Sequence, residues 1–320
     1  MVPRVATGRL AALLAAAALL TVACAAEPED IARRHGLLVL TADADGAAAL
    51  QTWVATDDGA AARDVGLPGP ATTWVAAGRA SVLVATLADG SLHVSDPVVP
   101  DDPALGDLAW RPVEAVDLTG DPAPGPAWFP TWDPEGGRFA ALTGDLAGGG
   151  TISMTLVDPT TSTSFTMPLP AQPLAAAPAW VDADRLAFTG GSSSEPAAVL
   201  VDTTTGSSSE GPPGDRRVAS SADGSVVATT AGPGSPVTVR ATDAWLAHDG
   251  TSIGAVEPPA DGATAASIAL DGTGTRLAVA WLLAGGSIRI DVHDGNAGWG
   301  RVSSETHDDG AIGAVVGWLR

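Results

Sequence analysis

The sequence predicts an all-β fold, a six-bladed β-propeller built from four-stranded antiparallel blades. One short phrase recurs along the chain, and its anchor residues are separated by steps of 58, 48, 40, 48 and 50 residues. The segments between the anchors are short, rich in β-branched residues and bounded by Gly, Asp or Pro, as strands are. No convincing amphipathic helix follows the first 24 residues. A period of this length made only of strands is typical of propeller blades.

The recurring phrase is clearest in TWDPEGGRFAALTG, residues 131–144, where Trp132 stands four residues before Gly136. Asp, Pro and Gly at its centre favour a tight turn, because they supply a preset or a positive φ angle. We expect the tryptophans among the anchor residues to lie in the core, wedged against the neighbouring blade, and not in a ligand cage. The six anchors are Trp74, Trp132, Trp180, Ser220, Ile268 and Trp318.

Four strands can be assigned in the blade that holds this phrase. They cover Ala127–Trp132, Arg138–Thr143, Thr151–Asp158 and Ser164–Met167. Five continuous blades of this kind begin near residues 70, 123, 175, 215 and 263.

The sixth blade is split between the two ends of the chain. We expect Ala314–Leu319 to supply its inner strand, and Leu37–Thr41, Ala48–Val54 and Arg63–Val65 to supply the other three. Pairing of the C-terminal strand with the N-terminal strands closes the ring. Closure removes the exposed sheet edges that invite aggregation.

The nonapeptide Trp-Asp-Pro-Glu-Gly-Gly-Arg-Phe-Ala at 132–140 resembles the Trp-Ser-Pro-Asp-Gly-x-x-Ile-Ala blade motif of TolB-type, WD40-like (PD40) propellers. One blade matches this motif well and the others match it loosely. The resemblance implies the propeller fold. TolB proteins also carry an N-terminal α/β domain, and no segment here is long enough to supply one, so the resemblance does not carry over their partners.

Residues 1–23 have the pattern of a bacterial lipoprotein signal peptide. Arg4 and Arg9 precede an apolar run that is too short to span a bilayer comfortably. The run ends at Thr21-Val22-Ala23-Cys24, which resembles a lipobox, with Thr21 where that family prefers leucine. The alternative is an ordinary signal peptide with an incidental cysteine. Cys24 is the only cysteine, so it cannot form an internal disulfide, and this favours the lipobox.

This pattern predicts three parts of the chain. Residues 1–23 are the signal peptide, residues 24–35 a polar tether, and residues 36–320 a single propeller domain. We expect Cys24 to carry a lipid that holds the exported protein at the extracytoplasmic face of the cell membrane.

Composition excludes several function classes. The formal net charge is −21, which argues against binding a nucleic-acid backbone, because such binding needs arginine and lysine on one face. The chain has no lysine, and therefore neither a phosphate-loop lysine nor a Schiff base. It has no tyrosine, which excludes a sialidase-type propeller with a tyrosine nucleophile.

No catalytic motif stands above background. GTSIG at 250–254 matches Gly-x-Ser-x-Gly with Ser252 in the nucleophile position, but the expected turn leads into a short strand and not into the helix that this elbow requires. His248 and Asp249 are near Ser252 in sequence, yet a triad is a spatial arrangement. We predict that no catalytic residue is present.

Metal and cofactor sites are equally unsupported. The sequence DADG at 43–46 begins like a calcium loop, but Val54 occupies the twelfth position instead of a bidentate Glu. We expect solvated loops at the acidic pairs Asp57-Asp58, Asp101-Asp102 and Asp308-Asp309. No two histidines have metal-ligand spacing; they are His35, His93, His248, His293 and His307. We predict no metal and no cofactor.

These observations favour a non-enzymatic, monomeric platform for unknown protein partners at the cell envelope. One alternative is a receptor that binds a small molecule or glycan in the central funnel. Another is a cell-envelope hydrolase or lyase. Clustered carboxylates or histidines in the funnel would indicate the enzyme, aromatics with amides the receptor, and a bland channel the platform, because fold alone does not decide function.

Overall fold

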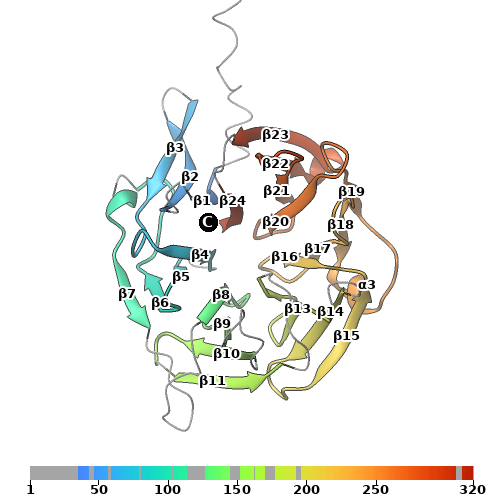
Figure 1. Ribbon diagram of the computed structural model, residues 1–320, viewed down its shortest axis with the longest axis horizontal. Helices are drawn as coiled ribbons and strands as arrows, with labels where there is room; N and C mark the ends of the chain where they lie inside the picture. Colours follow the sequence, from blue (N-terminus) through green and yellow to red (C-terminus); the bar gives the residue numbers. More distant parts are fainter. Residues whose placement is uncertain are drawn as a thin grey trace, which may run out of the picture.

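Six four-stranded sheets are arranged as the blades of a ring in the computed structural model, as Figure 1 shows. The structure describes residues 35–42, 47–56, 59–78, 81–102, 104–113, 127–144, 152–161, 163–169, 177–191, 196–307 and 312–319. Every blade is antiparallel, and in the five continuous blades the innermost strand is the first that the chain enters. The prediction of an all-β, six-bladed propeller is therefore confirmed.

The first three blades, numbered along the chain, contain the following strands. Blade 1 consists of β24 (Ile312–Trp318), β1 (Leu37–Ala42), β2 (Ala48–Thr56) and β3 (Gly59–Val65). Blade 2 consists of β4 (Thr72–Ala77), β5 (Leu83–Leu87), β6 (Leu92–Ser95) and β7 (Trp110–Val113). Blade 3 consists of β8 (Ala127–Trp132), β9 (Phe139–Thr143), β10 (Ser153–Asp158) and β11 (Thr163–Pro168).

The other three blades follow in order. Blade 4 consists of β12 (Ala179–Trp180), β13 (Arg185–Gly191), β14 (Pro196–Asp202) and β15 (Ser208–Pro213). Blade 5 consists of β16 (Arg217–Ser220), β17 (Val226–Thr230), β18 (Val237–Ala241) and β19 (Gly254–Val256). Blade 6 consists of β20 (Thr264–Leu270), β21 (Arg276–Leu282), β22 (Ile288–Asp294) and β23 (Gly300–His307).

The two ends of the described chain close the ring, as predicted. Strand β24 pairs antiparallel with β1, with Leu37 opposite Trp318, and a bulge interrupts the register between Leu38 and Val39. The amide of Leu319 also donates to the carbonyl of Gly36 at 2.7 Å. Blade 1 is consequently assembled from both ends of the propeller, which Figure 1 shows as β24 beside β1.

The apolar core lies between the blades. Six clusters of buried side chains each join two neighbouring blades of the described chain. A middle strand such as β9 is buried along its whole length, because neighbouring blades cover both of its faces. A Cβ atom at Gly78 would lie 2.9 Å from the Trp132 ring, so the glycine of one blade leaves room for the tryptophan of the next.

Within the described residues, three short helical elements connect the strands: η1 (Leu105–Asp107), α3 (Thr242–Leu246) and η2 (Gly295–Ala297). Helix α3 has only five residues, which are too few to produce the amphipathic period that the sequence lacks after its N-terminal segment. Its Trp245 is fully buried and donates from Nε1 to Asp215 Oδ2 at 2.8 Å. None of the helices in the described residues has the length and apolar character needed to cross a membrane.

Candidate functional site

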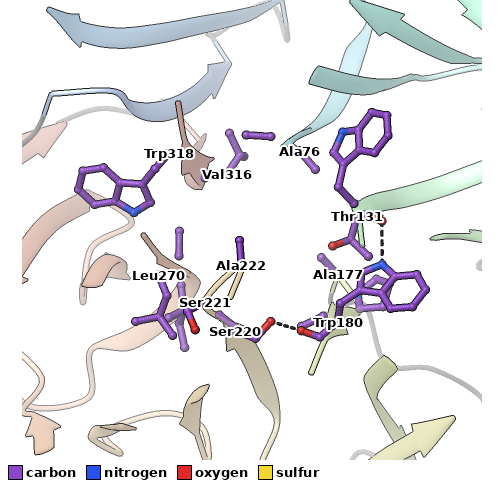
Figure 2. Close-up of a pocket in the computed structure, with 18 of the residues that line it drawn as sticks. Ala76, Thr131, Ala177, Trp180, Ser220, Ser221, Ala222, Leu270, Val316 and Trp318 are labelled. Carbon is purple, nitrogen blue, oxygen red and sulfur yellow. Dashed lines mark hydrogen bonds between the residues drawn. The ribbon is translucent and has the colours of Figure 1, made fainter. Parts of the chain in front are cut away.

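The inner strands of the six blades surround a central cavity of about 180 Å³. Figure 2 shows its wall, with Trp180 and Trp318 on opposite sides of the opening. Small and apolar side chains make up most of this wall, which the inner strands and the turns after them supply. Representative residues from the six blades are Val316, Ala76, Thr131, Ala177, Ser220 and Leu270.

Hydrogen bonds within the wall tie one blade to the next. Trp180 Nε1 donates to the carbonyl of Thr131 at 3.1 Å, and the Ser220 hydroxyl donates to the carbonyl of Trp180. Between the adjacent blades 6 and 1, the Ser267 hydroxyl accepts from the amide of Val315 at 2.8 Å. These hydrogen bonds therefore join blade 3 to blade 4, blade 4 to blade 5, and blade 6 to blade 1.

The anchor tryptophans are core residues. Trp132, Trp180 and Trp318 are all buried, as the sequence predicts, while Trp74 is half-buried and meets Phe129 edge to face. Only part of each indole faces the cavity, so the tryptophans do not form an open aromatic cage.

The inner hairpin of blade 3 holds blade 4 through a charged side chain. The Asp133 carboxylate accepts from the amide of Gly137 at 3.0 Å and from Arg138 Nε at 3.3 Å. Arg138 then donates to the carbonyl of Ala183 at 3.0 Å, and its guanidinium lies 5.2 Å from the centre of the Trp180 ring. This Asp–Arg–Trp contact fixes the turn and joins two blades.

The same arrangement recurs between blades 6 and 1. Arg276 Nε donates to Asp271 Oδ2 at 3.1 Å, and the guanidinium lies 4.5 Å from the centre of the Trp318 ring. Spacing in the sequence could have indicated it, because the aspartate stands five residues before the arginine in both hairpins. Its partner tryptophan belongs to the next blade, so a single phrase does not reveal the contact.

Two ionisable residues line the cavity in the described part of the chain, Asp133 and Arg217. Asp133 is engaged by Arg138 as above. Arg217 opens β16 and is half-buried, and burial lowers the pKa of its guanidinium. Sequence analysis did not single out Arg217, since one arginine at the start of a short strand matches no motif.

The Gly-x-Ser-x-Gly match lies far from this cavity in the fold. Ser252 is exposed in the turn between α3 and β19, and no helix follows it. His248 is exposed as well, and Asp249 Oδ1 accepts from the amide and hydroxyl of Thr251 at 2.9 and 2.6 Å. The structure thus confirms the expected turn and short strand at this motif.

The histidines are spread over four blades or their connections. His35 lies 3.2 Å from Asp101, and His307 lies 3.5 Å from Glu305. His293 is buried on β22, with Nδ1 3.1 Å from the carbonyl of Trp299, and burial lowers its pKa. Among the described residues, no three His, Cys, Asp or Glu side chains are grouped as metal ligands.

Several predicted features lie outside the described residues. They are the signal peptide and Cys24, the segment 43–46, and the pairs Asp57-Asp58 and Asp308-Asp309. Lipidation of Cys24 therefore stays a prediction. The remaining pair, Asp101-Asp102, is exposed, as expected of solvated charges.

No family model matches the chain, and no curated protein matches its sequence. Solved propeller structures do match its fold. TolB from Acinetobacter baumannii has a TM-score of 0.62 at 14% identity, with 88% of this chain and 66% of that chain covered. The chain thus spans just under two thirds of the length of that TolB.

Two further solved structures, of proteins with other names than TolB, are similar to this chain in fold. A chain of a nidogen/laminin complex has a TM-score of 0.56 at 10% identity, covering 88% of this chain and 98% of that one. The propeller of Cps50 (Swd1) from Myceliophteria thermophila has a TM-score of 0.52 at 15% identity, covering 86% and 85%. At these identities the similarity shows the fold: this chain is a six-bladed β-propeller similar to those of TolB, nidogen/laminin and Swd1 structures.

Proposed function

We propose that this protein is a lipid-anchored, extracytoplasmic propeller that binds protein partners and does no chemistry of its own. The observation that carries the proposal is the channel wall. Its serine hydroxyls are taken up by the fold, since Ser220 bonds to Trp180, Ser221 to Asp223 and Ser267 to Val315. No histidine lines the cavity in the described residues, so these serines have no neighbouring base there.

The lining also argues against the receptor alternative for a glycan. Glycan recognition would call for amide and exposed aromatic side chains in the funnel. The described wall contains no Asn or Gln, and three of its four tryptophans are buried between blades. A channel of this kind supports the platform, whose contacts would lie on the outer surface.

One end of the ring offers a defined surface for a partner. The inner hairpin turns of blades 3, 4 and 5 meet at this end, and we name it the turn face. Glu135, Asp184 and Asp223 are exposed on it, one in each of three successive turns. We propose that a partner docks on the turn face with basic side chains toward these carboxylates.

An affinity pull-down from solubilised membranes tests the proposal, with the lipidated full-length chain as bait. The substitution E135Q/D184N/D223N removes the charges of the turn face. A matched variant, E210Q/E257Q/D261N, removes three exposed charges from other parts of the surface. We expect specific partners to be lost with the first variant and kept with the second.

Equal recovery with both variants would contradict docking on the turn face. Absence of any specific partner with the unmodified chain would contradict the platform itself. The comparison is informative because both variants carry the same net charge, so nonspecific electrostatic capture changes equally in both.

A further inference from the structure

Arg217 has no counter-ion among the described residues of the ring. It lines the central cavity, is half-buried, and has neither an ion pair nor a side-chain hydrogen bond within the described chain. Five other arginines of that chain each have an aspartate oxygen within 3.6 Å. They are Arg138, Arg185, Arg240, Arg276 and Arg289. Arg217 is distinguished from the other described arginines that have no ion pair, Arg63, Arg111, Arg216 and Arg301, because it alone lines the cavity.

The one carboxylate among the described residues of the cavity wall has other partners. Asp133, the one acidic residue among the described lining residues, is engaged by Arg138 and by the amide of Gly137. Burial lowers the pKa of the Arg217 guanidinium, and no carboxylate of the described residues offsets that effect. A desolvated and unpaired charge is costly, and an anion from solution would reduce that cost.

The chemistry of the site selects the anion. A guanidinium presents a planar fork of donors that fits a carboxylate in a bidentate manner. One positive charge balances a monoanion, whereas a dianion would leave excess negative charge in a poorly solvated space. Val218 and Ala219, which follow Arg217 on β16, also line the cavity, and most of the other lining residues have small or apolar side chains.

The size of the cavity limits the ligand further. Its volume of about 180 Å³ is below the roughly 300–1,000 Å³ of pockets that take drug-sized molecules. An organic acid with a short apolar chain fits both this volume and the apolar wall.

We propose that the central cavity binds a small monocarboxylate, whose carboxylate pairs with Arg217 and whose apolar part contacts the channel wall. This site is independent of partner docking on the turn face. A negative pull-down would not contradict the monocarboxylate site. Absence of monocarboxylate binding would not contradict the proposal that the protein is a binding platform.

Titration calorimetry of the purified full-length chain tests the site, with butyrate and acetate as probes. Butyramide is the neutral control, and succinate and inorganic phosphate, in a mildly alkaline buffer in which phosphate is mostly doubly charged, are the dianionic ones. We expect one saturable site for butyrate, several-fold weaker binding of acetate because it buries less apolar surface, and no saturable binding of butyramide. Succinate and phosphate should bind more weakly than butyrate.

Variants assign the site to one side chain. R217Q should weaken butyrate binding at least tenfold, and R217K should retain part of it, because lysine keeps the charge but loses the fork. R301Q, on the exposed start of outer strand β23, is the matched control and should bind butyrate as the unmodified chain does. Butyrate should also raise the melting temperature of the unmodified chain and not that of R217Q.

If Arg217 instead stabilised the fold, R217Q would have a lower melting temperature than the unmodified chain. Because removal of an unpaired buried charge does not destabilise the fold, R217Q should melt no lower than the unmodified chain. Equal affinity for butyrate and butyramide, equal affinity of R217Q and R301Q, or no saturable binding of either acid would each overturn the proposal.

Discussion

The guanidinium of Arg276 lies over the Trp318 indole, 4.5 Å from the ring centre, and thereby joins the last continuous blade to the blade that closes the ring. The same arginine donates from Nε to the buried carboxylate of Asp271 at 3.1 Å. One side chain thus holds the turn of blade 6 and covers the anchor tryptophan of blade 1. A contact of this kind is strongest where the cation is partly desolvated.

Replacement of Arg276 by alanine should lower the free energy of unfolding by about 1–3 kcal/mol, the range expected for a cation–π contact and a hydrogen bond to a charged group. Urea unfolding monitored by tryptophan fluorescence measures the change. Arg301→Ala, on the exposed part of β23, is the control and should change stability little. Equal stabilities of the two variants would show that the contact between Arg276 and Trp318 contributes nothing.

The architecture could be predicted because each blade repeats information that is local in sequence. Strand Ala127–Trp132 was predicted with the bounds that the structure has, and the split blade was predicted from the phrase at Trp318. The turn chemistry of Asp133 to Gly136 and the alternation of strands need no distant partner to be recognised.

The candidate site was less predictable because it depends on contacts between blades. Arg138 meets Trp180, and Arg276 meets Trp318, only after neighbouring blades pack together. Arg217 stands out only once the fold shows that Asp133, the one carboxylate of the described channel wall, is already paired with Arg138. No spacing rule expresses such a relationship.

Cys24 should carry the lipid, because it follows an apolar run with small residues before it. Cys24→Ser should move the protein from the membrane fraction to a secreted or unprocessed form, as immunoblots of cell fractions would show. Substitution of the neighbouring Ala25 by serine is the control and should leave the protein in the membrane fraction. Normal signal cleavage with unchanged membrane retention of Cys24→Ser would count decisively against the lipoprotein hypothesis.

Ser252 should have no catalytic role, because it lies in an exposed turn without a following helix. Ser252→Ala should leave any hydrolase activity of the purified protein unchanged, and a serine-directed fluorophosphonate should not label the unmodified chain. Labelling at Ser252 that disappears when the protein is unfolded would contradict the non-enzymatic proposal.

His293 should make the fold sensitive to acid. Burial lowers its pKa from the ordinary value of 6.5, its Nδ1 lies near the carbonyl of Trp299, and Nε2 has no hydrogen-bond partner within the described chain. The unfolded state therefore takes up the proton at a higher pH than the folded state does. The stability contributed by neutral His293 is complete above about pH 6.5 and is lost as pH falls through the lower folded pKa.

Melting temperatures between pH 8 and pH 5 (roughly the range over which histidine charges) would measure this effect. His293→Gln should flatten the acid side of the profile, whatever its effect at pH 8. The exposed His248 is the control, so His248→Gln should keep the slope of the unmodified chain. A His293→Gln profile parallel to that of the unmodified chain would exclude His293 as the titrating group.

We expect strand β24 to be required for closure of the propeller ring. Strand β24 pairs with β1 along its length, the amide of Val315 donates to Ser267 Oγ at 2.8 Å in blade 6, and Trp318 lies in the cluster between blades 6 and 1. A chain that ends at Gly310 loses all three contacts and exposes the edge of β1.

The expected loss is large on the scale of a single domain. Removal of a buried tryptophan alone costs about 3–5 kcal/mol, against the roughly 5–15 kcal/mol by which a domain is stable. Cys24 is the only cysteine, so no internal disulfide compensates. We therefore expect the chain ending at Gly310 to aggregate or to melt far below the full-length chain, as calorimetry and size-exclusion chromatography would show. Trp318→Ala should have a milder effect and Trp318→Phe, which keeps a ring under Arg276, a smaller one still. An unchanged melting temperature after truncation would mean that pairing of β24 with β1 does not hold the propeller closed.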